Sequence, residues 1–160
     1  MSKPKIERTL VLVKPDGVVR GLIGEVVKRF EMVGLKIVGM KMMKITPDFA
    51  KQHYFAHVEK DFYPELEKRI IAGPVIAAVL EGMNAVEVVR KIVGSTESKS
   101  SVPGTIRGDF AHVGLDYQGT KNIVHASGNL EEAEKEVGLW FSEKELFEYK
   151  TMYEKHIEEE

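Results

Sequence analysis

The stretch NIVHASGN, residues 122–129, contains a side chain that suits group transfer. His125 follows a short β-forming run and precedes the small residues Ala126, Ser127 and Gly128. A neutral imidazole is a good nucleophile near pH 7, and small neighbours leave room for a bulky reacting group. A packed or surface histidine at a strand end would look the same. The stretch alone therefore leaves catalysis and packing open.

A second candidate region is the segment from Gly94 to Lys121, which is rich in glycine and serine and has little periodicity. A loop this long in a compact domain is usually functional or disordered. Its core, PGTIRGDF, mixes apolar residues with a proline and an arginine, which favours an ordered loop. The hydroxyls of Thr96 and Thr105 and the guanidinium of Arg107 are groups that hold phosphate oxygens. The alternative is a solvated surface loop with an incidental arginine.

The common nucleotide-binding signatures are missing. KPDGVVRGLIG has a lysine and glycines after a predicted strand, but no stretch matches G-x-x-x-x-G-K-[ST] or a G-x-G-x-x-G that follows a strand. His53 and His57 are four residues apart on one predicted helical face, which is a spacing that can bind metal, but no carboxylate or third histidine completes the set. We expect these two, and also His112 and His156, to be structural or surface residues.

Composition limits the class of protein. The chain has 160 residues, of which 43% are apolar and 30% charged, as in a soluble globular protein with one domain over residues 1–160. No apolar run is long enough to span a bilayer, and the net charge of −2 argues against a generally basic nucleic-acid surface. The chain contains no cysteine, so thiolate metal sites and a cysteine nucleophile are excluded. We expect a cytoplasmic protein that binds neither membranes nor nucleic acid.

Hydrophobic periodicity predicts which elements position these groups. Continuous apolar runs indicate buried strands, and the turn signal PDG ends the first of them. The predicted strands cover residues 8–14, 35–45, 75–80 and 122–127, and the predicted helices cover 21–34, 48–56, 63–72, 84–92 and 130–138, with more helix at the C-terminus. This order fits an α+β ferredoxin-like sandwich, in which helices cover one face of a four-stranded antiparallel sheet. In a regular strand Asn122 and His125 would point to opposite faces, so one pocket can use both only if Asn122 precedes the strand or a bulge intervenes.

The chain resembles the nucleoside diphosphate kinase family from Glu7 to about Tyr149. The resemblance rests on five blocks in register, which are ERTLVLVKPDGVVRGLIGEVVKRFE, QHYFAH, GPVIAAVLEG, PGTIRGDF and NIVHASGNLEEAEKEVGLWF. It implies transfer of the γ-phosphoryl of a nucleoside triphosphate to a nucleoside diphosphate through a phosphohistidine, with broad base specificity. Mg²⁺ would be carried by the nucleotide phosphates, with no protein metal ligand. It also implies a homo-oligomer, a hexamer in the commonest form or a tetramer.

The resemblance assigns roles by position. His125 matches the phosphate-accepting histidine, Glu136 the acid that orients it, and Ser127 the neighbouring hydroxyl. The remaining matches bind nucleotide: Lys14, Arg90, Thr96 and Arg107 on the phosphates, Tyr54 near the reacting group, Asn122 with Lys14 on the sugar, Phe62 and Val113 on either side of the base, and Leu66 at its edge.

The chain also departs from the family pattern. The commonest sequence after the histidine is Gly-Ser-Asp-Ser, whereas residues 126–129 read Ala-Ser-Gly-Asn, which removes an acid near the site. The segment Gly114–Lys121 is longer than in most members, and Ser98 replaces a common proline in a loop that members use for subunit contacts.

Two other functions remain as alternatives. The first is a regulatory or nucleic-acid-binding module, which would expose aromatic residues on its strands. The second is a family member that has lost catalysis and only oligomerises. The second is disfavoured because the matched site residues are intact, namely Lys14, Tyr54, Arg107, Asn122, His125 and Glu136.

Overall fold

A four-stranded antiparallel sheet forms the centre of the molecule. The structure is a computed structural model and describes residues 5–111 and 121–157. Its strands are β1 (Ile6–Val13), β2 (Lys36–Met43), β3 (Val75–Met83) and β4 (Val124–Ala126), in the spatial order β2-β3-β1-β4. Each neighbouring pair is antiparallel. This order is that of a ferredoxin-like sandwich and confirms the predicted fold class.

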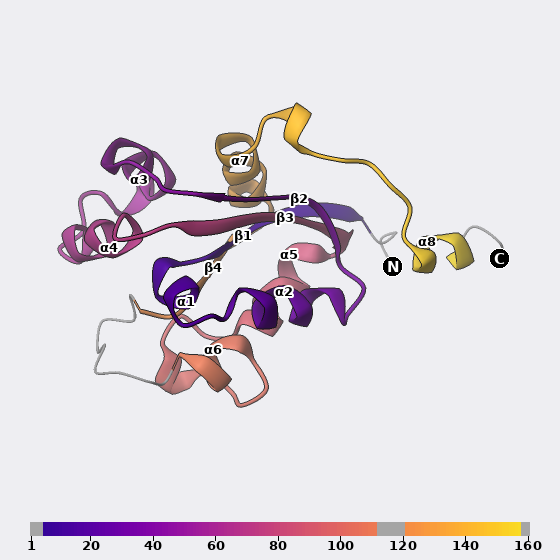
Figure 1. Cartoon of the computed structure of the whole chain (residues 1–160), viewed down its shortest axis with the longest axis horizontal. Helices are drawn as coiled ribbons and strands as arrows, with labels where there is room; N and C mark the ends of the chain where they lie inside the picture. Colours follow the sequence, from indigo (N-terminus) through magenta and orange to yellow (C-terminus); the bar gives the residue numbers. More distant parts are fainter. Residues whose placement is uncertain (1–4, 112–120, 158–160) are drawn as a thin grey trace.

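Helices cover both faces of this sheet. Side chains alternate along β1, so Val11 and Val13 join one buried cluster and Leu10 and Leu12 join another. Figure 1 shows α2 (Ile23–Glu31) and α5 (Ala85–Val93) on one side of the sheet and α7 (Leu130–Trp140) on the other. The cluster on the α7 side also contains residues of α3 (Pro47–His53) and α4 (Tyr63–Ile70).

The expectation of helices on one face is therefore wrong. Continuous apolar strands, such as the fully buried run from Leu10 to Val13, are typical of sheets that are covered on both faces. Neither face offers an exposed aromatic platform, since the exposed aromatic residues of the described chain, among them Phe55, Phe62 and Tyr149, lie outside the strands. The alternative of a regulatory or nucleic-acid-binding module therefore lacks the exposed strand aromatics that it requires.

Local signals explain where the elements begin. The side chain of Thr46 accepts a hydrogen bond from the amide of Phe49 and caps α3, and Pro47 occupies its first turn. The PDG turn is in fact a one-turn helix, α1 (Pro15–Val19), because proline also suits the first position of a helix. The predicted fourth strand shortens to β4, because Ile123 has a φ of 70° and leaves the extended conformation.

The described part of the long segment, residues 94–111, is ordered as expected. It contains η2 (Ser98–Ser100) and the short helix α6 (Ile106–Phe110). Thr105 caps α6 by accepting a hydrogen bond from the amide of Gly108. A Cβ at Gly108 would collide with the carbonyl of Val102, so this turn requires glycine. The other elements are η1 (Phe55–His57), η3 (Glu143–Glu145) and α8 (Met152–Ile157). In the described ranges no helix has the length and apolarity needed to span a membrane.

Candidate active site

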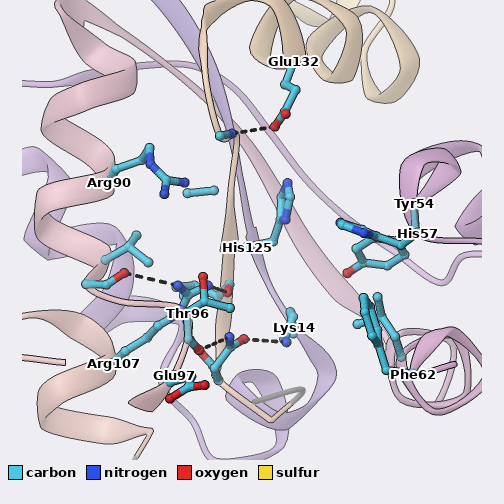
Figure 2. Close-up of a pocket in the computed structure, with 17 residues that line it drawn as sticks. Lys14, Tyr54, His57, Phe62, Arg90, Thr96, Glu97, Arg107, His125 and Glu132 are labelled. Carbon is cyan, nitrogen blue, oxygen red and sulfur yellow. Dashed lines mark hydrogen bonds between the residues drawn. The ribbon is translucent and has the colours of Figure 1, made fainter. Parts of the chain in front are cut away.

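A cavity of about 420 Å³ lies beside β4 and brings most of the predicted site residues together. Figure 2 shows Arg90, Thr96 and Arg107 on one side of His125, and Tyr54, His57 and Phe62 on the other. The predicted residues that line it are Lys14, Tyr54, Phe62, Leu66, Arg90, Thr96, Arg107, Asn122 and His125. Glu136 and Ser127 contact His125 or its partner from outside the cavity wall. Val113 lies outside the described residues.

His125 is held by an acid and a hydroxyl. Its Nε2 atom lies 2.9 Å from Oε2 of Glu136, and the Ser127 hydroxyl donates to the same oxygen at 2.7 Å. A carboxylate only accepts hydrogen bonds, so Nε2 must carry the hydrogen. The lone pair of the neutral ring is then on Nδ1. This arrangement leaves Nδ1 as the nitrogen that can act as a nucleophile.

Asn122 and His125 line the same cavity because the chain turns between them. Asn122 precedes β4, and Ile123 adopts the left-handed region with a φ of 70°. A β-branched residue in this region costs on the order of 1–3 kcal/mol and persists only where its surroundings hold it. Here the Asp16 carboxylate accepts the Ile123 amide at 3.0 Å, and the Ile123 carbonyl accepts the Lys14 amide at 2.7 Å. Of the two arrangements that would let one pocket use both residues, the structure has the one in which Asn122 precedes the strand, and the predicted strand start at Asn122 is wrong.

Lys14 and Asn122 form a buried polar pair at the floor of the cavity. They are 6% and 4% exposed, and the Lys14 ammonium donates to Asn122 Oδ1 at 2.6 Å. The Asn122 amide group donates in turn to the carbonyl of Thr96 at 2.9 Å. Each side chain is thereby fixed before any ligand enters, which favours precise binding of a polar ligand.

Arg107 is a buried cation that three backbone carbonyls orient. Its guanidinium donates to the carbonyls of Val124 at 2.8 Å, Gly94 at 3.2 Å and Asn122 at 3.4 Å. Burial, followed by the nearby positive charge of Arg90, lowers the pKa of Arg107 to about 10, so it remains charged at neutral pH. A preformed buried cation suits an anionic ligand such as a phosphate.

The opposite wall is aromatic. Phe62 is 42% exposed, and its ring centroid lies 5.6 Å from that of His57. Leu66 is half-buried one turn further along α4. Tyr54 is buried, and its ring stands perpendicular to that of His125 with centroids 6.3 Å apart. Burial, with the nearby Glu136 charge, raises the pKa of Tyr54, so its hydroxyl keeps its hydrogen. An exposed aromatic face beside fixed cations suits a ligand with both a ring and phosphates.

Sequence reasoning missed three ionisable side chains of the cavity wall, namely His57, Glu97 and Glu132. We expected the site to lose an acid, but Glu132 supplies one. Its carboxylate accepts the Gly128 amide at 3.0 Å and lies where a Cβ of residue 128 would point. The signal was the spacing Asn129-x-x-Glu132, which resembles a capping box, and Asn129 does cap α7. For His57 and Glu97 the sequence carries no comparable signal.

His53 is structural, as expected, but it is closely associated with the candidate nucleophile. It is buried, its Nδ1 accepts a hydrogen bond from Trp140 Nε1 at 3.1 Å, and its ring packs edge-to-face on His125 with centroids 4.5 Å apart. Burial, and then the charges of His125 and His57, lower the pKa of His53 well below its usual value, so the ring is neutral at pH 7. His57 belongs to no group of three metal-ligating side chains in the described residues, but His125 and Glu136 approach His53 from other parts of the chain.

Comparison with known proteins agrees with this geometry. The family model described as nucleoside diphosphate kinase matches residues 7–146. A nucleoside diphosphate kinase of Pyrococcus horikoshii is 55% identical over 144 residues, which are 89% of this chain and 90% of that protein.

Two solved structures are similar over nearly their whole lengths. A nucleoside diphosphate kinase of Halobacterium salinarum in complex with CDP has a TM-score of 0.88 and 42% identity, covering 96% of this chain and 99% of that one. A transition-state mimic of the Borrelia burgdorferi enzyme with vanadate and ADP has a TM-score of 0.86 and 44% identity, covering 94% and 96%. One cavity contains a histidine oriented by a carboxylate, buried cations and an aromatic wall, in agreement with these matches. This chain belongs to the nucleoside diphosphate kinase family.

Proposed function

We propose that the chain transfers the γ-phosphoryl group of a nucleoside triphosphate to a nucleoside diphosphate in two steps through a phosphohistidine on His125. The observation that carries the proposal is the hydrogen bond between His125 Nε2 and Glu136. It leaves the Nδ1 lone pair for attack on the γ-phosphorus, and the bond from that phosphorus to the β,γ-bridging oxygen breaks. The nucleoside diphosphate leaves, and a second one reverses the step. A covalent intermediate divides one transfer between two anions into two steps.

Glu136 and Ser127 support both steps without exchanging a proton. As Nδ1 bonds to phosphorus, the ring becomes positively charged, and the Glu136 carboxylate stabilises that charge through Nε2–H. The Ser127 hydroxyl holds the carboxylate in the orientation that this bond requires. Tyr54, which keeps its hydrogen, serves as a neutral donor beside the reacting group.

Phosphoryl transfer depends mainly on positioning and on stabilisation of charge. Lys14, Arg90 and Arg107 supply three cations in the cavity, and Thr96 supplies a hydroxyl. Asn122 and Lys14 bind the sugar, and the exposed face of Phe62, with Leu66 beside it, contacts the base. Val113 is proposed for the other face of the base from the resemblance alone. The relatives whose structures hold ADP with vanadate and CDP support a site for both purine and pyrimidine nucleotides.

The donor set of the cavity fits a divalent cation that the nucleotide carries. Its carboxylates, Glu97 and Glu132, belong to no cluster of three metal-ligating side chains in the described part of the chain. Mg²⁺ supplies neutralisation of phosphate charge when it is bound.

We also propose a cytoplasmic homo-oligomer, a hexamer or a tetramer. Exposed apolar side chains near the edge strand β2, namely Met32, Val33, Met40 and Met42, support an interface with another subunit. Light scattering at micromolar concentration tests this, and a monomer would contradict it.

The phosphohistidine is tested by incubation with ATP that is radiolabelled on the γ-phosphate. The wild-type protein should retain the label, and the bond should be labile in acid and stable in base. His125→Ala should retain none while still binding nucleotide, whereas His57→Ala, which removes another histidine of the same cavity, should still become labelled. Substantial turnover by His125→Ala would exclude the proposed mechanism, and absence of label on the wild type would favour a family member that only oligomerises.

A further inference from the structure

His53 has a buried ring nitrogen that the proposed reaction does not use. Its side chain is 9% exposed, and Trp140 occupies Nδ1. The other nitrogen, Nε2, is buried and has no hydrogen-bond partner among the described residues. Buried polar atoms are nearly always paired, so each exception calls for a physical explanation, which can be an unseen ion.

Two other metal-ligating side chains lie beside the His53 ring. One ligand atom each from His53, His125 and Glu136 lie within 4.8 Å of one another, and they are the only such group of three found in the described chain. Two histidines and a glutamate form the donor set of several catalytic zinc sites. We propose that these three side chains form a site for Zn²⁺, or a similar late first-row divalent cation, and that the bound metal inhibits the enzyme.

The distances fit this class of metal. Zinc lies about 2.0–2.1 Å from histidine nitrogen and about 2.0–2.2 Å from carboxylate oxygen, which places tetrahedral ligand atoms about 3.4 Å apart. His125 Nε2 and Glu136 Oε2 are 2.9 Å apart, close to that value. The remaining pairs, at no more than 4.8 Å, must close by about 1.4 Å or less, which small side-chain rotations provide. Three protein ligands leave a fourth position for water.

A second, adjoining cavity gives access to the site. It has a volume of about 710 Å³ and is lined by residues of α3, η1 and α7, including His53, His125 and Glu136. His125 therefore lines both this cavity and the one assigned to nucleotide. Glu131, Glu132 and Lys135 also line the second cavity, and Lys135 pairs with Glu131 at 2.8 Å, so Glu132 and Glu136 are the carboxylates of this lining that favour a cation. Figure 1 shows α7 on the side of the sheet away from α2 and α5, so the metal enters from the α7 side.

The hydrogen positions explain why the metal would inhibit. A metal on His125 Nε2 displaces the hydrogen from that nitrogen, and in the neutral ring it moves to Nδ1. Nδ1 then has no lone pair for attack on phosphorus. The same exchange in His53 places a hydrogen on Nδ1, which can no longer accept the hydrogen bond of Trp140. No net proton is released, and the environment of Trp140 changes.

The first experiment measures binding without nucleotide, so its result does not depend on the proposed reaction. Equilibrium dialysis measures Zn²⁺ affinity, and Trp140, the only tryptophan in the chain, reports binding by its fluorescence. His53→Asn keeps a carbonyl acceptor for Trp140 but has no nitrogen in the place of Nε2. Loss of outer-shell partners typically costs 10–100-fold in metal affinity, so loss of this ligand should cost at least about tenfold. His57→Asn, which alters a histidine outside the group, should leave the affinity unchanged.

The outcomes separate the two halves of the proposal. Equal Zn²⁺ affinity in His53→Asn and the wild type would overturn the site. If His53→Asn does not fold, His125→Ala must lose affinity by a similar factor, or the site is overturned. Co²⁺ should show the intense visible absorption of four-coordinate cobalt, and a weak six-coordinate spectrum would also overturn it. The inhibitory half rests on the proposed function: preloading with Zn²⁺ should slow labelling of His125 in the wild type, and unchanged labelling would remove inhibition while leaving the site.

Discussion

Glu136 Oε2 accepts two hydrogen bonds at once, from His125 Nε2 at 2.9 Å and from the Ser127 hydroxyl at 2.7 Å. Ser127 is fully buried, and its hydroxyl also accepts the Leu10 amide of β1 at 3.3 Å. The carboxylate therefore links the orientation of the histidine to the buried strand β1. The tautomer of His125 is determined by this link and not by the imidazole itself.

The first prediction concerns the charge of Glu136. Glu136→Gln keeps the size of the side chain but replaces a charged acceptor with a neutral one. Hydrogen bonds to charged groups contribute about 1.5–3 kcal/mol, so kcat should fall by about 10–100-fold. Pre-steady-state labelling of His125 measures the step directly. Ser127→Ala removes only the neutral donor and should have the smaller effect, and equal rates for Glu136→Gln and the wild type would show that the carboxylate does not assist transfer.

The second prediction concerns Arg107, whose guanidinium satisfies three backbone carbonyls. Arg107→Lys keeps the charge but cannot reach all three, because an ammonium lacks the planar fork of donors. Buried acceptors that lose their partners cost about 1–3 kcal/mol, and we expect a loss of that size in the free energy of unfolding. Chemical denaturation measures it. Arg90→Lys alters an exposed cation of the same cavity and should weaken nucleotide binding without changing stability. Equal stability losses in both variants would contradict the structural role of Arg107.

The third prediction concerns base selectivity. Among the described residues assigned to the base, Phe62 and Leu66 have no side-chain hydrogen-bonding group, so the enzyme should use ADP, GDP, CDP and UDP with kcat/KM values within about a hundredfold. Phe62→Ala should weaken binding of all four by about 1–3 kcal/mol, the contribution of stacking on one aromatic ring. Phe55→Ala removes an exposed phenylalanine that lines the other cavity and is the matched control. Near-exclusive use of one base would show that polar groups contact the base edge.

The sequence predicts those parts of the site that lie within short blocks. Lys14 directly follows β1, Arg107 lies in the capped helix α6 and His125 lies in the short strand β4, and each stands in a stretch whose local pattern is informative. The Trp140 bond to His53 joins positions 87 residues apart, so no local spacing reveals it. The left-handed conformation of Ile123 is equally invisible, because isoleucine disfavours it and hydrogen bonds with Asp16 and Lys14, together with burial of the side chain, hold it there. Tertiary contacts determine these features.

The fold also has features that local sequence patterns predict and features that they do not. Strand periodicity predicts the strands and their order in the chain, but the helices were expected on one face only. The continuous apolar run of β1 carried the information that both faces are covered. In the PDG stretch, by contrast, the sequence does not contain the needed information. Proline and glycine suit both a turn and the first turn of a helix, and only packing distinguishes the two.

The last prediction concerns Glu81 and acid stability. Glu81 accepts from Arg8 at 2.7 Å, and Lys36 lies 2.7 Å from its other oxygen. Burial raises the pKa of Glu81, but the hydrogen bonds from Lys36 and Arg8 outweigh burial and hold the pKa below its usual value. A carboxyl whose folded pKa is depressed stabilises the protein above its unfolded pKa of about 4.3, and this stabilisation is lost as the pH falls through the folded pKa.

Glu81→Gln should therefore lower the free energy of unfolding at pH 7 by about 1.5–3 kcal/mol, the usual contribution of a hydrogen bond to a charged group. The difference from the wild type should shrink as the pH falls below about 4. Urea denaturation from pH 7 to pH 3 measures both effects. Glu87→Gln removes an exposed carboxylate that pairs with Lys91 one turn away, and it should leave stability unchanged at every pH because exposed pairs contribute little. A difference for Glu81→Gln that stays constant across this range would mean that packing, and not the charge of Glu81, accounts for the loss.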